Sequence, residues 1–215
     1  MLHEDLMLLF INEQNGKLRA DSSSVENALA GAVLIELVNS GRVAFEPNGK
    51  KLQIVDPTPL KDAVLQESVT RFDKPMKPQR AVERIRKRLR DNVGAQLEGR
   101  GVVRVGSRKV MGIFPAKSYA ITDEAAQNDV RKAVVEVAHG YRGADARTGS
   151  LVALLYAVKA VHKVVEGDKR EMTKRAKDIA AGNWASEAVR RAVEAIQAGV
   201  VAATAAAAAA SSSGG

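Results

Sequence analysis

Cysteine is absent from this 215-residue sequence, and aromatic residues make up only 4% of it. The absence of cysteine excludes disulfide bonds, thiolate metal sites and cysteine nucleophiles, and it fits a reducing, cytoplasmic compartment. Histidine is also scarce, since His3, His139 and His162 are far apart and no H-E-x-x-H spacing is present. The sequence therefore indicates no metal site, no cofactor and no enzymatic activity.

Other short motifs that could carry chemistry are incomplete. The segment Gly99-Arg100-Gly101 lacks the third glycine of G-x-G-x-x-G, and no strand-loop-helix order surrounds it, so we assign it no nucleotide. The run Ser22-Ser23-Ser24 is interpreted as a loop and helix cap rather than a nucleophile. Trp184, the single tryptophan, is expected to pack against a helix start.

Long hydrophobic runs are missing as well. The apolar residues 6–11 are too few for a signal peptide, and the acids Glu4 and Asp5 precede them where a cationic region belongs. Residues 195–210 carry no charge, but alanine and glycine supply little energy for transfer into a membrane. We therefore expect any membrane contact to be peripheral, at the cytoplasmic face.

Positive charge is the property that the sequence has in excess. The formal net charge is +8 and the pI is near 9.8, which favours a polyanionic partner, either nucleic acid or an anionic lipid surface. The length and the 46% hydrophobic content suit one globular domain. We assign that domain to residues 1–200 and a low-complexity Ala/Ser/Gly tail to residues 201–215.

Hydrophobic periodicity predicts a mainly α fold, a single compact helical bundle with two short β-hairpins. The predicted hairpins pair residues 42–45 with 51–55, and residues 102–105 with 110–114 around a Gly106-Ser107 turn. The helix over 151–165 has the broadest apolar face and is expected to be the central core helix. The other predicted helices cover 28–39, 60–71, 82–98, 123–138, 171–180 and 186–198.

The most informative stretch runs from Arg80 to Arg108 and begins with an arginine-dense segment, Arg80 to Arg90. Apolar residues recur at helical spacing at Ala81, Ile85, Leu89, Val93 and Leu97 and predict one buried stripe. The cations Arg84, Arg86, Lys87 and Arg90 are then left on the outer arc of the helix. Because cations at this density repel one another, they favour an anionic partner, although a solvated helix face is the alternative interpretation.

One run carries a family resemblance. Residues 31–43, Gly-Ala-Val-Leu-Ile-Glu-Leu-Val-Asn-Ser-Gly-Arg-Val, resemble the G-x-x-L-I-E-L-x-x-x-G-R-[LV] signature of the Golgi-phosphoprotein-3-like family. Segments 6–9, 82–101 and 150–157 support the resemblance. The resemblance implies a compact helical bundle and a bacterial member of the family. It also implies a peripheral membrane protein that binds phosphatidylinositol 4-phosphate.

The resemblance also implies a lipid-phosphate site. Eukaryotic members hold the phosphate with a tryptophan and three arginines, and the matching positions here are Asp21, Ala30, Lys87 and Arg90. Lys87 and Arg90 keep the charge and lie three residues apart, where a continuous helix would let both reach one phosphate. Loss of the tryptophan and of one arginine favours a general preference for anionic phospholipids over strict phosphoinositide selectivity.

The family also inserts an apolar hairpin into the bilayer, and residues 102–114 match it. The membrane-inserting wedge would consist of Val110, Met111, Ile113 and Phe114, flanked by Arg108 and Lys109, whose charges favour an anionic surface. The alternative is that this segment is a buried strand of its own domain.

Nucleic-acid binding is the main rival, because a basic helix followed by a two-stranded wing is also the pattern of a winged helix-turn-helix protein. A recognition helix, however, should mix arginine with Asn, Gln, Ser or Thr to read base edges, and residues 84–90 offer only cations and apolar residues. We therefore favour an anionic membrane surface as the partner, with membrane-protein cargo as a further partner that the family implies.

Overall fold

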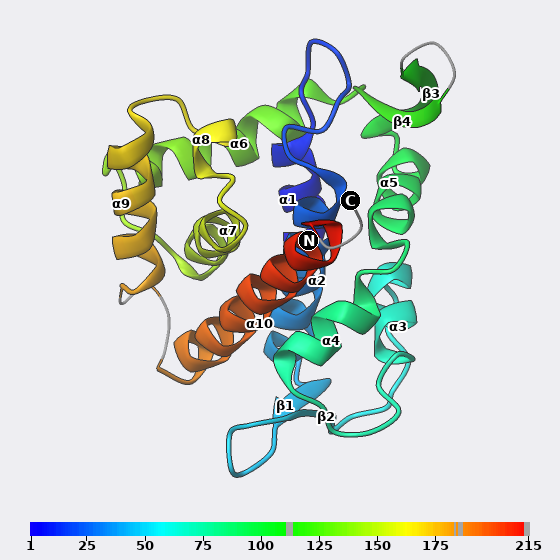
Figure 1. Cartoon of the computed structure of the whole chain (residues 1–215), viewed down its shortest axis with the longest axis vertical. Coiled ribbons are helices and arrows are strands. Elements are labelled where there is room, and N and C mark those ends of the chain that lie inside the picture. Colours follow the sequence, from blue (N-terminus) through cyan, green and yellow to red (C-terminus); the bar gives the residue numbers. More distant parts are fainter. Residues whose placement is uncertain (111–113, 183, 185–186, 213–215) are drawn as a thin grey trace.

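The computed structural model describes residues 1–215 apart from 111–113, 183, 185–186 and 213–215. The described chain forms ten α-helices and two antiparallel two-stranded sheets, which confirms the expected mainly α fold (Figure 1). The elements in chain order are α1 (Leu2–Phe10), α2 (Ser22–Asn39), β1 (Val43–Phe45), β2 (Leu52–Ile54), α3 (Ala63–Val69), α4 (Pro78–Ile85), α5 (Leu89–Gly99), β3 (Val103–Val110), β4 (Phe114–Ile121), α6 (Glu124–Ala138), α7 (Ala146–Ala157), α8 (Val161–Val164), α9 (Lys169–Ala180) and α10 (Glu187–Ser212).

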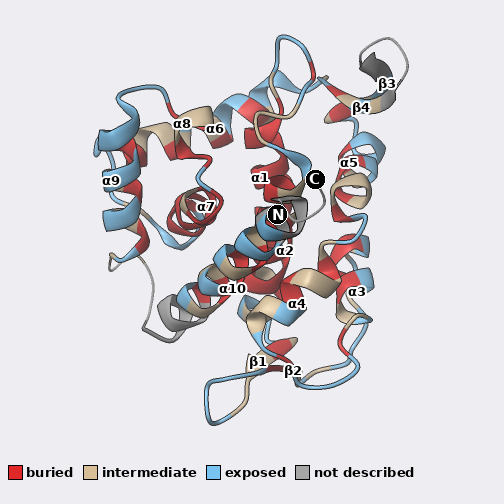
Figure 2. Ribbon diagram, in the orientation of Figure 1, coloured by how far each residue is buried: buried red, intermediate tan, exposed pale blue. Residues whose placement is uncertain are grey.

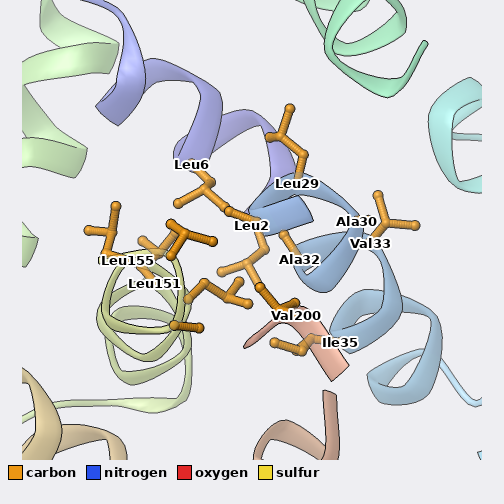
Figure 3. Packing of buried hydrophobic residues seen from close by; sticks show 14 of the residues in the cluster. Leu2, Leu6, Leu29, Ala30, Ala32, Val33, Ile35, Leu151, Leu155 and Val200 are labelled. Carbon is orange, nitrogen blue, oxygen red and sulfur yellow. The ribbon is translucent and has the colours of Figure 1, made fainter. Parts of the chain in front are cut away.

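The core lies where α1, α2, α7 and α10 meet (Figures 2 and 3). Helix α2 is buried around its whole circumference between residues 27 and 35, as expected of a helix that is apolar on every side. Gly31 permits this packing, because a Cβ atom there would lie 2.6 Å from Leu154 Cδ2 and 2.9 Å from Val200 Cγ2. Figure 3 shows Leu6, Leu151 and Val200 converging on this region.

Two helices begin at different residues from those predicted, because an aspartate caps each of them. Helix α2 begins six residues before the predicted residue 28, because the Asp21 carboxylate accepts a hydrogen bond from the Ser24 N–H and caps the helix. Helix α3 begins at residue 63 rather than 60, because Asp62 caps it in the same way through the Leu65 N–H. The prediction for α6 is confirmed, with Asp123 as its N-cap.

The central core helix is interrupted. The single helix predicted over residues 151–165 is instead α7 followed by the short α8, because the chain turns at Lys159, which has a left-handed φ of 55°. The expected burial is nevertheless confirmed, since Leu151, Leu154, Val161 and Val165 are all buried. Core packing therefore determines which residues are inside without requiring a continuous helix.

The second hairpin is longer than predicted. Gly106 and Ser107 do not form its turn, because Gly106 pairs with Ser118 and Ser107 pairs with Lys117 within the ladder. The pairing continues to Val110 and Phe114. The first hairpin, β1–β2, matches its predicted position.

Helix α10 continues through Ser212, well into the residues assigned to a low-complexity tail. Ala203 is buried and Thr204 accepts a hydrogen bond from Asn27 Nδ2 at 3.1 Å, so α10 packs on α2 at least as far as Thr204. Trp184 lies against Gly149 in the first turn of α7, and its indole N–H donates to the Ile179 carbonyl.

Candidate functional site

The arginine-dense segment is two helices rather than one. Helix α4 ends at Ile85, Arg88 takes the left-handed conformation with φ 60°, and α5 begins at Leu89. The predicted apolar stripe at residues 81, 85, 89, 93 and 97 is buried throughout, so the side-chain prediction is confirmed while the continuous helix is wrong. The turn at Arg88 redirects the chain, and the cations of this segment face two different parts of the surface.

Arg84 faces the loop between α3 and α4. Its guanidinium forms an ion pair with Asp73 and donates to the Arg71 carbonyl at 3.2 Å. Hydrogen bonding from Arg84 lowers the pKa of the Asp73 carboxyl below its ordinary value. Arg84 and Lys87 line a surface hollow of about 480 Å³ that also contains Asp73 and Glu83. Arg84 therefore holds a loop in place, and Asp73 and Glu83 offset only part of the charge of this hollow, which Arg71 and Arg80 also line.

Arg86 and Arg90 face the first turn of α2. Arg86 Nη1 donates to Ser23 Oγ at 3.2 Å, and Arg90 Nη1 donates to Ser22 Oγ at 2.9 Å. Arg90 Nη2 also lies 3.2 Å from Asp91 Oδ1. Two guanidinium groups thus lie at a helix N-terminus, where backbone N–H groups and the helix dipole also favour an anion.

A second surface hollow, of about 420 Å³, opens beside this helix terminus. We call it the α2–β4 hollow, because it lies between the start of α2, Arg90 of α5 and the strand β4. Its polar lining is Asp21, Ser22, Arg90, Lys117 and Tyr119, and Leu18, Ala20 and Ala116 complete the wall.

The charges in the α2–β4 hollow are mixed. Arg90 and Lys117 supply two cations, and Lys117 Nζ lies 3.1 Å from Asp91 Oδ1. Burial would raise the pKa of Asp21, but hydrogen bonding from Ser24 outweighs burial and lowers it, so Asp21 is ionised at neutral pH. The Tyr119 hydroxyl is enclosed and has no hydrogen-bond partner among the described residues. The hollow therefore offers an anion two cations, both of which already contact Asp91, and Asp21 is a second carboxylate beside them.

The four positions that the family resemblance singled out do not all line one hollow. Asp21 and Arg90 both line the α2–β4 hollow, whereas Lys87 is exposed and lines the hollow of Arg84. Ala30 is fully buried in the core. The shared phosphate contact expected of Lys87 and Arg90 assumed a continuous helix, whereas the left-handed Arg88 separates the two residues here.

The β3–β4 hairpin extends from the body at one edge of the molecule (Figure 1). Its base is anchored by Val103 and Tyr119, which are both buried, and Tyr119 N–H donates to the Gly16 carbonyl. Val110 and Phe114 form the last backbone pair of the ladder. Met111 and Ile113 of the expected wedge lie outside the described residues, as do the side chains of Val110 and Phe114.

Sequence reasoning missed Lys117 and Tyr119 as members of a site. Both lie on β4, and the hairpin turn had been placed at Gly106-Ser107, which left these residues beyond the predicted strands. Alternation of Ala116, Ser118 and Ala120 with Lys117, Tyr119 and Ile121 was the available signal for a strand there.

A buried polar cluster around the first turn of α1 was also not predicted from the sequence. His3, Glu4 and Asp5 are all buried, although charged residues near a chain start are usually exposed. Glu36 accepts hydrogen bonds from the Leu2 and His3 N–H groups and contacts His3 Nδ1. Glu36 is the glutamate of the L-I-E-L run, so that residue satisfies the first turn of α1.

No group of three or more His, Cys, Asp or Glu side chains in the described part of the chain is arranged to hold a metal ion. Among the helices that the structure describes, none combines the length and the apolar character needed to cross a membrane.

The model of the Golgi phosphoprotein 3 (GPP34) family matches residues 2–196, which is almost the whole of the folded chain. The protein therefore belongs to the Golgi phosphoprotein 3 (GPP34) family. No curated protein matches the sequence.

Proposed function

We propose that this protein is a peripheral membrane protein that binds anionic phospholipid headgroups in the α2–β4 hollow and inserts the tip of the β3–β4 hairpin into the bilayer. Phosphatidylinositol 4-phosphate is the headgroup that the family resemblance favours. The protein acts at the cytoplasmic face of a membrane without a catalytic step, and membrane-protein cargo is its further partner. Family membership and the basic composition support this proposal.

One observation carries the proposal: strand β4 contributes both to the α2–β4 hollow and to the hairpin tip. Lys117 and Tyr119 line the hollow, while Phe114, at the start of the same strand, lies at the hairpin tip. Three residues of β-strand span about 10 Å, which is close to the depth over which interfacial segments enter a bilayer. A headgroup in the hollow would therefore lie at the membrane surface when the tip reaches the acyl region.

The charges predict the character of this binding. A phosphate oxygen would replace Ser22 Oγ as the acceptor of Arg90, and a guanidinium can hold a phosphate through two parallel hydrogen bonds. Asp21 opposes the phosphate from the same hollow. We therefore expect binding of moderate strength that weakens as salt concentration rises.

Vesicle sedimentation tests the proposal. Vesicles of phosphatidylcholine alone are compared with vesicles that also contain phosphatidylserine or phosphatidylinositol 4-phosphate. The double variant Arg90→Gln/Lys117→Gln should lose most of the binding to anionic vesicles, whereas the control Lys50→Gln/Lys51→Gln on the exposed β1–β2 loop should keep it. Lys87→Gln should have a small effect, because Lys87 lines the other hollow.

Two outcomes contradict the proposal. Equal binding to phosphatidylcholine vesicles would remove the role of the headgroup. Binding to duplex DNA that is tighter than binding to anionic vesicles, and that the Arg90→Gln/Lys117→Gln variant weakens, would establish the nucleic-acid alternative instead. Thermal melting of each variant shows whether the fold is retained.

A further inference from the structure

Helix α9 carries a second concentration of positive charge, far from the α2–β4 hollow. At about 100° per residue, its cations and carboxylates lie on different arcs. Glu171, Arg175 and Asp178 share one arc, and Arg175 forms an ion pair with Glu171. The other arc carries four exposed cations that form no ion pair with any described residue, namely Lys169, Arg170, Lys174 and Lys177.

An apolar recess adjoins this cationic arc. The recess has a volume of about 390 Å³ and lies between α7, α8, α9 and α10, with apolar walls from Tyr156, Ala157, Val161 and Val201. Val201 is 48% exposed, which is unusual for an aliphatic side chain on a helix that is otherwise packed into the core. Lys159, His162 and Lys169 form the rim of the recess.

The recess and the arc form one continuous groove. A neighbouring hollow on α9 shares Tyr156, Lys169 and Thr173 with the recess. This hollow extends along α9 past Lys174 to Lys177. Burial lowers the pKa of His162 below its ordinary value, and the nearby charges of Lys169 and Lys163 lower it further. We call the recess and its extension the α9 groove.

We propose that the α9 groove binds an acidic peptide segment, with one apolar side chain in the recess and carboxylates along the cations of α9. Lys169 and Lys177 are eight residues apart, or about 12 Å along the helix, which matches about four residues of extended peptide. Charge complementarity selects an acidic occupant, and the recessed apolar walls select one that carries a bulky aliphatic or aromatic anchor.

The shape of the groove favours a peptide over a bilayer. A membrane contact presents apolar side chains that protrude, whereas Ala157 and Val161 are buried at the floor of a recess. Helix α9 also lies across the molecule from the β3–β4 hairpin, with α1, α2 and α10 between them (Figure 1). A peptide in the groove therefore leaves the hairpin free, and this proposal is independent of lipid binding.

Fluorescence anisotropy with labelled peptides tests the proposal on the full chain. The probe is a Gly-Asp-Glu-Leu-Glu-Asp-Gly peptide, compared with one that has Ser in place of Leu and one that has Lys in place of every acid. The wild-type protein should bind the Leu peptide more tightly than the Ser peptide and should not bind the Lys peptide. Affinity should fall as salt concentration rises, because exposed charges are screened.

Three variants locate the binding. Lys169→Glu/Lys174→Glu should weaken binding of the Leu peptide about tenfold or more, because two attractions become repulsions. Val201→Ser should weaken binding of the Leu peptide and leave the weaker binding of the Ser peptide unchanged. The control Lys50→Glu/Lys51→Glu has the same charge change on the β1–β2 loop and should bind like the wild type.

The proposal is overturned if the wild type fails to distinguish the three peptides, or if Lys169→Glu/Lys174→Glu binds the Leu peptide as well as the wild type does. It is also overturned if that variant loses binding to anionic vesicles or duplex DNA while its peptide binding is intact. Circular dichroism and melting temperature of the exposed lysine variants show that they are folded.

Discussion

Asp21 has two roles that pull in opposite directions. Its carboxylate caps α2, and it stands at the position where the family resemblance places a tryptophan beside the lipid phosphate. A negative charge in the hollow of Arg90 is unfavourable for an anionic ligand, yet it stabilises the helix that forms one wall. Local helix stability and ligand affinity therefore compete at this one residue.

Asp21→Asn separates these two roles. Asparagine caps a helix nearly as well as aspartate, so the melting temperature should change little. Removal of a unit charge close to the phosphate should increase the affinity for phosphatidylinositol 4-phosphate vesicles about two- to tenfold. Sedimentation at low and physiological salt measures this. Unchanged or weaker vesicle binding would show that the headgroup does not occupy the α2–β4 hollow.

Glu4 gives a test of the buried polar cluster around the first turn of α1. Burial alone would raise the pKa of Glu4, but hydrogen bonds from Arg100 and Gln96 outweigh burial and lower the pKa to about 2. Because the folded-state pKa is depressed, the stabilisation by ionised Glu4 is complete above its ordinary pKa of 4.5 and is lost as pH falls toward 2.

Arg100→Met should therefore destabilise the protein by about 1–3 kcal/mol near neutral pH, since it removes a charged hydrogen-bond donor from a buried carboxylate. Urea unfolding between pH 7 and pH 2 should show the difference from wild type shrinking below pH 4.5. The control Arg104→Met removes an exposed arginine of β3 that has no ion pair among the described residues. A difference that is constant with pH would contradict this account.

At the scale of the element, helices and strands were predicted most accurately where hydrophobic periodicity and burial coincide. Most helices and both hairpins were found, and the stripe through Ile85 and Leu89 is buried as predicted. The breaks were missed, because Arg88 and Lys159 adopt left-handed conformations without a glycine to signal them. Tertiary packing offsets the cost of these two conformations, and the hydrophobic periodicity of a single sequence gives no information about tertiary packing.

The same limit explains what was missed in the candidate site. Cations were identified by residue type, but the directions of Lys87 and Arg90 depend on the turn between them. The partners Ser22 and Ser23 lie more than sixty residues earlier in the sequence, and no local pattern links them to Arg86 and Arg90. Long-range contacts of this kind require the fold.

The β3–β4 hairpin makes its own prediction. Ile113→Ser/Phe114→Ser should reduce binding to anionic vesicles at least ten- to hundredfold, because the loss of even one large apolar side chain costs about 1.5–3 kcal/mol of transfer out of water. Binding to duplex DNA should be unaffected. Sedimentation and a DNA mobility-shift assay compare the two. A large fall in melting temperature instead would identify these residues as part of the core.

At the scale of the whole molecule, close helix crossings determine the packing. A Cβ atom at Gly199 would lie 2.7 Å from the Gln79 backbone nitrogen and 2.9 Å from the Pro78 carbonyl carbon. Backbone atoms cannot move aside as a flexible side chain can, so α10 and α4 approach closely only because residue 199 is glycine.

Gly199→Ala should accordingly destabilise the protein by about 1–3 kcal/mol through overpacking. Gly99→Ala is the matched control, because Gly99 is also helical and a Cβ atom there meets nothing within 4 Å. That control should be neutral or slightly stabilising, by less than about 1 kcal/mol. Denaturant unfolding of both variants measures the difference, and equal stabilities would contradict the proposed crossing.

A two-stranded ribbon has an outer edge on each strand, and in β3–β4 these edges are satisfied near the base. The Val105 N–H donates to Glu98 on one side, and the Tyr119 N–H donates to Gly16 on the other. Beyond these anchors, outward-facing peptide groups need water or polar headgroups, because hydrocarbon offers them no partners. Only the end of the ribbon can therefore enter the acyl layer, so attachment through it would be shallow and readily reversed.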